Sequence, residues 1–248
     1  MDEFEQVLKV ADTYVSDHDP AKCSWSWGEA LLMYSLCRLD DELGENRFLP
    51  FYKAWADHHH QAGYVVDQSD TCAPVLLTNE LFKKTGDEKY LEMTRAGIHY
   101  LKNEPRLVDD LINHNGHSRD SKDYPKSIWV DSMMMSGVFS AIAAQDFGDD
   151  ELRAFALTQP RQFAKYLQDP DSKLFHHSWW KILKRPYPRG LFWGRGNGWV
   201  VASLSLFLDY LDDAEVCRLL REVSSALLPL QRDDHYFDTV VNKPGDNY

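Results

Sequence analysis

The sequence lacks most of the features that place a chain in a membrane, outside the cell or on nucleic acid. No apolar run reaches the ~18 residues needed to cross a bilayer. The acidic start, residues 1–5, lacks the basic-then-apolar layout of a signal peptide, and the four cysteines form no CxxC motif. Basic residues are outnumbered: 27 Lys and Arg stand against 39 Asp and Glu, a net charge of −12. Because such a charge repels polyanions, we expect no nucleic acid and no membrane as partner, and we predict a reducing, cytoplasmic setting.

Alternating β-branched runs are also nearly absent, and most of the chain has helical spacing. Two kinds of helix alternate. Segments that are apolar on nearly every face, and therefore expected to be buried, begin near residues 27, 74, 129 and 199. Amphipathic segments, each with one face toward solvent, are expected at 3–15, 48–62, 87–102, 150–167 and 213–229. This alternation predicts a single all-α domain over residues 1–248, either a solenoid or a closed ring of hairpins, and the uneven loop lengths favour a ring enzyme.

Polar residues gather just before the buried segments. Asp70 precedes the second, a loop with His114 and His117 leads to Asp131 at the start of the third, and residues 193–199 open the fourth. If the buried helices run parallel, these loops lie at one end of the ring, where helix N-termini favour an anionic ligand. The pattern therefore predicts one funnel lined by histidines, carboxylates and tryptophans.

Asp131 lies between two apolar stretches, residues 128–130 and 133–135. A carboxylate in such surroundings loses hydration, so we expect a raised pKa and a general acid near neutral pH. The alternative is a helix N-cap, for which aspartate is a preferred residue. Asp70 has the same two interpretations, because Pro74 is expected to open a helix four residues later.

The segment Trp-Gly-Arg-Gly-Asn-Gly-Trp, residues 193–199, offers several kinds of contact at once. Glycines at alternate positions let a backbone approach a neighbour closely. Arg195 and Asn197 supply charged and amide donors, and Trp193 and Trp199 supply stacking faces. A ligand-binding loop is predicted, and a tight turn packed by tryptophan is the alternative. No metal site is expected, because His114 and His117 lack acidic neighbours at ligand spacing.

Three motifs together resemble glycoside hydrolase family 105, the unsaturated rhamnogalacturonyl hydrolases, which are related to the unsaturated glucuronyl hydrolases of family 88. They are IWVDSMMM (128–135), LFHHSWW (174–180) and FWGRGNGW (192–199). The resemblance implies an (α/α)6 barrel, with Asp131 as general acid/base and Asp70 as a second carboxylate. It further implies that the substrate is held by Trp193, Arg195, Asn197, Trp199, His177 and His117.

The same resemblance implies the reaction. The enzyme would remove a 4,5-unsaturated uronic acid from the non-reducing end of lyase-generated oligosaccharides, by acid-catalysed hydration of the C4=C5 vinyl ether and without a cofactor. A six-hairpin ring needs twelve helices, whereas nine are predicted here. We therefore expect a C-terminally incomplete barrel, with a homo-oligomer as one way to cover the gap. A glycosidase acting on saturated sugars and a non-catalytic sugar-binding remnant are the alternatives.

Overall fold

The computed structural model describes residues 3–246, which form two compact units. The first unit comprises residues 3–66 and 71–99. The second comprises residues 67–70 and 100–246. The single domain expected over residues 1–248 stays a prediction.

The first unit is helical throughout. Its core contains large side chains that are almost fully buried, among them Trp55, Tyr52 and Met33. The helix α2 packs against α3, which was predicted to be amphipathic, and against α5, which like α2 was predicted to be buried. The elements are α1 (Glu3–Asp17), the 3-10 turn η1 (Pro20–Lys22), α2 (Trp27–Leu43), α3 (Leu49–Ala62), α5 (Val75–Thr85) and most of α6 (Glu88–Asn103).

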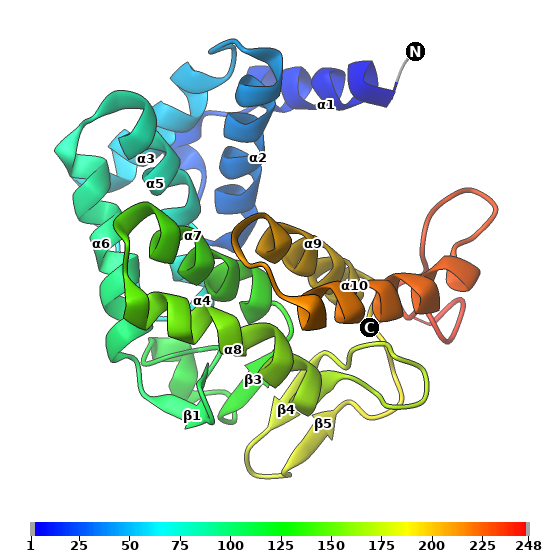
Figure 1. Cartoon of the computed structure of the whole chain (residues 1–248). Coiled ribbons are helices and arrows are strands. Elements are labelled where there is room, and N and C mark those ends of the chain that lie inside the picture. Colours follow the sequence, from blue (N-terminus) through cyan, green and yellow to red (C-terminus); the bar gives the residue numbers. More distant parts are fainter. Residues whose placement is uncertain (1–2, 247–248) are drawn as a thin grey trace. The chain divides into compact units, whose positions relative to one another are not determined.

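The second unit combines helices with two small sheets. Helix α7 packs against both α8 and α9, and α9 packs against α10 (Figure 1). Every residue from 138 to 144 is buried, which matches the all-round apolar character of that segment. The helices are α7 (Val138–Phe147), α8 (Asp150–Leu167), α9 (Gly194–Tyr210) and α10 (Ala214–Leu227), with 3-10 turns η2 (Arg119–Lys122) and η4 (Leu228–Leu230).

Within residues 3–246 a helix is present at each of the nine predicted positions, but two of the buried ones begin elsewhere. The third begins at Met133 rather than near 129, as a π-helical turn η3 (Met133–Gly137) that leads into α7. The fourth begins at Gly194 rather than 199, because the glycine-rich segment is the first turn of α9 and not a loop. The predicted loop and its alternative, a tight turn, are therefore both wrong for the backbone, while ligand binding by this segment stays a prediction.

Short strands are the main feature that the sequence did not predict. The strands β1 (Arg106–Val108) and β2 (Leu111–Ile112) form one antiparallel pair. The strands β3 (Ser127–Trp129), β4 (Ser178–Trp180) and β5 (Arg185–Tyr187) form an antiparallel sheet in that order (Figure 1). Two or three residues are too few to show a period-2 pattern. No helix in the described part of the chain has the length and apolar character needed to cross a membrane.

Candidate active site

The pairing of β3 with β4 brings Asp131 to His177. The Val130 N–H donates to the His177 carbonyl at 2.8 Å, and Nε2 of His177 lies 3.4 Å from Oδ2 of Asp131. The Asp131 side chain is only 14% exposed, and among the described residues its buried Oδ2 has no well-aligned hydrogen-bond donor. The backbone carbonyl of Asp131, not its side chain, accepts the first helical bonds, from Met134 and Met135. The side-chain carboxylate of Asp131 is therefore not the N-cap of this helix.

The pKa of Asp131 moves in the direction opposite to the one expected from the sequence. Burial opposes its ionisation, but the contact with His177, together with the charge of His114 and His177, outweighs burial and lowers the pKa below its ordinary value. The expectation of a raised pKa at Asp131 is wrong, because apolar sequence neighbours do not reveal imidazole rings brought in from distant segments. Asp131 is therefore ionised at neutral pH.

Asp70 lies in the short helix α4 (Ser69–Cys72), which is tied to the His114 loop. The Ser69 N–H donates to the His114 carbonyl at 2.9 Å. The Ser69 hydroxyl donates to Ser132 Oγ at 2.9 Å, which leaves the single Ser132 proton free to be donated to Nδ1 of His114, also at 2.9 Å. In that arrangement Nε2 of His114 carries the ring proton, and it lies 3.6 Å from Oδ1 of Asp70.

The pKa of Asp70 is raised to about 7, first by burial and then by the charges of Asp131 and Asp120. Burial lowers the pKa of His114 to about 4, so this ring is neutral at neutral pH and cannot stabilise an Asp70 carboxylate as a cation would. Near neutrality, therefore, one carboxyl of the pair, Asp70, can hold a proton while the other, Asp131, is charged. Two carboxyl groups with pKa values pushed apart are the usual arrangement of an acid and a base at one site.

Aromatic rings connect these groups. Trp129 stacks on His114 with ring centroids 4.2 Å apart and meets His177 edge-on at 5.0 Å. The His177 ring lies 4.7 Å from Trp193, and the Arg195 guanidinium lies 4.3 Å from the centroid of the Trp193 ring. Arg195 itself is exposed. The site thus has flat ring faces and one accessible cation beside the carboxyl pair, as an acidic sugar requires.

The glycines before Trp199 serve packing of the chain on itself. A Cβ on Gly194 would lie 2.6 Å from the Asp238 carbonyl oxygen, and a Cβ on Gly196 would lie 2.7 Å from the Trp193 ring. Nothing lies within 4 Å of a Cβ on Gly198. Close approach by a backbone was predicted, and at two of the three glycines the neighbour is the protein itself.

Asn197, predicted to bind substrate, belongs to the frame of the site. It is fully buried. Its Oδ1 accepts the Phe175 N–H at 2.8 Å, and its Nδ2 donates to the Phe175 and Trp193 carbonyls at 3.0 Å each. Because these backbone groups use the amide, we correct the expectation that Asn197 donates to a sugar.

The substrate-binding roles predicted for His117 and Trp199 stay predictions. The His117 side chain is 66% exposed and places Nδ1 2.6 Å from Oε2 of Glu104, so His114, not His117, is the loop histidine that contacts the carboxyl pair. The sequence already contained this signal, since both histidines lie in the polar loop, but spacing could not choose between them. Trp199 is partly buried on α9, where its carbonyl accepts the Ser203 hydroxyl.

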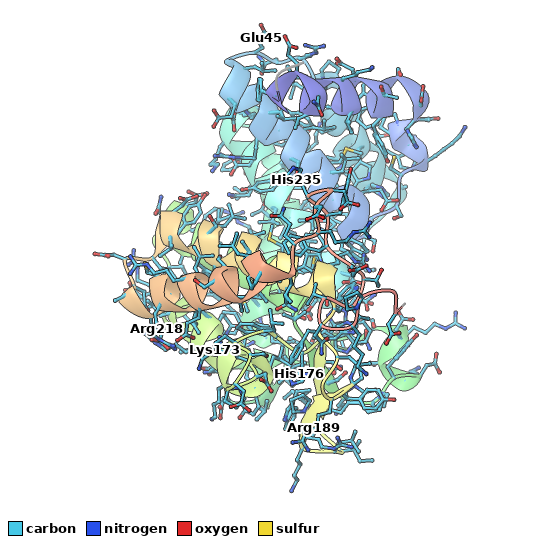
Figure 2. The ribbon with its side chains drawn as sticks, turned by 90° about the vertical axis from the view of Figure 1, so that its right-hand side faces the viewer. Glu45, Lys173, His176, Arg189, Arg218 and His235 are labelled. Carbon is cyan, nitrogen blue, oxygen red and sulfur yellow. The ribbon has the colours of Figure 1, made fainter. Side chains whose placement is uncertain are left out.

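His176 lies away from the pair although it is the sequence neighbour of His177. Its Nε2 is 3.9 Å from Oδ2 of Asp169, and together with Arg189 it lines a hollow of about 330 Å³. Both residues are labelled in Figure 2. Among residues 3–246 no group of three or more His, Cys, Asp or Glu side chains is arranged to hold a metal ion.

Comparison with known proteins identifies the family of this chain. The family described as Glycosyl Hydrolase Family 88 matches residues 3–248. The unsaturated rhamnogalacturonyl hydrolase YesR of Bacillus subtilis is 25% identical over 255 residues, which cover 98% of this chain and 72% of YesR. A family 105 glycoside hydrolase structure from C. acetobutylicum superposes with a TM-score of 0.81 at 20% identity, over 96% of this chain and 70% of that one. A structure described as a possible family 105 member from Salmonella enterica gives 0.82 at 20% identity, over 90% of this chain and 60% of that one.

The similarity to these solved structures, with the mostly helical structure, confirms the predicted α/α fold class. The family match defines a glycoside hydrolase. The chain belongs to glycosyl hydrolase family 88. The expected relation to families 88 and 105 is thereby confirmed.

Proposed function

We propose that this protein removes a 4,5-unsaturated uronic acid from the non-reducing end of oligosaccharides produced by a polysaccharide lyase. Membership of the family makes this protein a glycoside hydrolase. YesR, which aligns with 98% of this chain, is named an unsaturated rhamnogalacturonyl hydrolase. The observation that carries the proposal is the carboxyl pair, with the pKa of Asp70 at about 7 and that of Asp131 lowered. Hydration of a vinyl ether needs one proton donor and one base, which this pair supplies near neutral pH.

The reaction consumes one water. A proton adds to C4 of the C4=C5 bond and leaves an oxocarbenium-like centre at C5, which the ring oxygen stabilises. Water adds to C5 and loses a proton to a base, giving a hemiketal. The hemiketal opens, and the bond to the neighbouring sugar then breaks with release of both products.

We assign the proton delivered to C4 to Asp70 and the activation of water to the Asp131 carboxylate. The resemblance of the sequence implied that Asp131 is the general acid/base, but the positions of the charges support a division in which Asp70 is the acid and Asp131 the base. Asp131 has the imidazole of His177 at 3.4 Å, whereas Asp70 faces only the neutral His114 ring at 3.6 Å and the charges of other carboxylates. Arg195 and Trp193 would bind the carboxylate and the ring of the unsaturated sugar.

The test follows the absorbance of the conjugated double bond in lyase-generated disaccharides. We expect kcat/KM to be flat below pH 7 and to fall tenfold per pH unit above about 7, because Asp70 must be protonated. Asp70→Asn and Asp131→Asn should each lower kcat by roughly 10²–10⁴-fold, and the residual activity of Asp70→Asn should lose its alkaline limb. Asp171→Asn, an exposed aspartate in the same unit, is the matched control and should change neither.

Other outcomes of the same assay decide against the proposal. Folded protein that consumes no unsaturated disaccharide would remove it, and saturable binding without turnover would identify a sugar-binding protein instead. Release of product from saturated glycosides would favour a conventional glycosidase.

The cytoplasmic setting and the homo-oligomer stay predictions. The four cysteines are unpaired and three of them are buried, which supports a reducing compartment. A light-scattering mass for the purified chain tests the oligomer.

A further inference from the structure

A basic hollow lies beside the three-stranded sheet. Its volume is about 510 Å³, and three lysines line it: Lys122, Lys126 and Lys181. Asp123 is the one acidic residue of its lining. In a chain with a net charge of −12, a hollow dominated by lysine differs from most of the surface.

The backbone holds two of these lysines side by side. The Lys181 N–H donates to the Lys126 carbonyl at 3.0 Å, one position beyond the pairing of Ser127 with Trp180 that begins the β3–β4 ladder. Lys126 and Lys181 are therefore brought together by the sheet rather than by flexible loops.

The three lysines have no ion-pair partner among the described residues, although other lysines of the same unit do. Lys165 pairs with Asp109 at 2.6 Å, and Lys102 pairs with Asp149 at 2.6 Å. Three positive charges gathered around a single carboxylate, none of them in an ion pair with a described residue, repel one another, so an anionic ligand would bind here with a gain in electrostatic free energy.

Aromatic contacts join this hollow to the carboxyl pair. Tyr124, which lines the hollow and is 54% exposed, meets Trp129 edge-on with ring centroids 6.2 Å apart. Trp129 in turn stacks on His114. From Lys126 to Asp131 the chain advances five residues, at most about 17 Å in extended conformation, which is longer than one pyranose ring.

We propose that this hollow, the lysine hollow, binds the carboxylate of a further uronic acid on the leaving side of the substrate. The inference rests on the proposed function. The unsaturated sugar is the non-reducing end, so every further ring must lie on the leaving side of the bond that breaks. A lyase that leaves an unsaturated uronic acid acts on a polymer that contains uronic acids, so its longer products carry the carboxylates that the lysines would bind. The protein should therefore prefer acidic tetrasaccharides to disaccharides.

The experiment compares the unsaturated disaccharide and tetrasaccharide from one rhamnogalacturonan lyase digest. For the unaltered protein, kcat/KM should be higher for the tetrasaccharide, and this preference should decline as sodium chloride is added. In Lys126→Gln/Lys181→Gln the preference should fall about fivefold, as expected for the loss of two exposed ion pairs. The disaccharide, which is too short to reach the hollow, should be turned over at an unchanged rate.

Two further variants separate a subsite from a general effect of charge. Lys126→Arg/Lys181→Arg keeps both charges and should keep the preference. Lys9→Gln/Lys22→Gln removes two exposed charges from α1 and η1 and should leave the preference unchanged.

Each remaining outcome counts against a specific statement. Equal kcat/KM for both substrates in the unaltered protein, an unchanged preference in the Gln pair, or an equal loss in the Lys9 and Lys22 pair would overturn the lysine hollow as a subsite. Turnover of neither substrate by folded protein would overturn the proposed function, and this inference with it.

Discussion

Asp70→Asn should stabilise the protein at neutral pH while it lowers activity. The pKa of Asp70 is about 7 in the folded protein against an ordinary value of 3.8. The folded state therefore keeps a proton that the unfolded chain releases, and the free energy of unfolding falls as pH rises from about 4 to about 7. The difference between the two pKa values corresponds to about 4 kcal/mol, at 1.36 kcal/mol per pKa unit. Asparagine has a similar shape and cannot ionise, so the unfolding free energy of the variant does not fall with pH for this reason.

The assay is urea unfolding of both proteins at pH 5, 6, 7 and 8, followed by tryptophan fluorescence. The unfolding free energy of the variant minus that of the unaltered protein should grow by up to about 1.4 kcal/mol per pH unit between pH 5 and 7. Above about 7 the difference should level off. Gly198→Ala, which changes no ionisable group, should show a difference that is flat across the same range.

A difference between Asp70→Asn and the unaltered protein that stays constant from pH 5 to pH 8 would refute the reasoning. It would mean that Asp70 ionises with an ordinary pKa, and Asp70 would then not hold the proton for C4. A second result bears on the cause. Asp131→Asn removes one of the charges that raise the pKa of Asp70, so in that background the pH dependence should move to lower pH.

Three further predictions concern the frame of the site. Asn197→Ala leaves the Phe175 N–H and carbonyl without their partner and removes one of two donors to the Trp193 carbonyl, which keeps the backbone N–H of residue 197. It should lower the unfolding free energy by about 2–4 kcal/mol; an unaltered urea midpoint with only KM raised would contradict this. Gly196→Ala should lower the unfolding free energy by about 1–3 kcal/mol, because the new Cβ meets the Trp193 ring. Gly198→Ala on the same helix should raise the unfolding free energy by about 0.5–1 kcal/mol, and thermal midpoints measure both changes. His117→Ala should leave the turnover of an unsaturated disaccharide within about twofold, since this exposed ring contacts Glu104 and not the carboxyl pair.

Helix positions could be predicted because their signal is local. The apolar run that begins at Trp27 became a helix with the predicted start, and the amphipathic run 150–167 became a helix with both predicted bounds. The start of the third buried helix could not be predicted in this way, because residues 127–129 pair with β4, which lies some fifty residues later in the chain. A three-residue strand forms because a partner strand is there to pair with it, and three residues are too few to show an alternating apolar pattern.

The motifs indicated the family, and the resemblance predicted catalytic or substrate-binding roles for Asp70, Asp131, His177, Trp193 and Arg195. Which carboxyl holds the proton was decided only by the tertiary structure. The pKa of each depends on burial and on groups brought from separate parts of the chain, with His177 beside Asp131 and a neutral His114 beside Asp70. Tertiary contacts likewise bring His114 rather than His117 to the carboxyl pair. They also place the Asn197 amide in hydrogen bonds with backbone groups. Periodicity records which side of a helix is apolar, whereas ionisation depends on distances through space that no spacing along the chain contains.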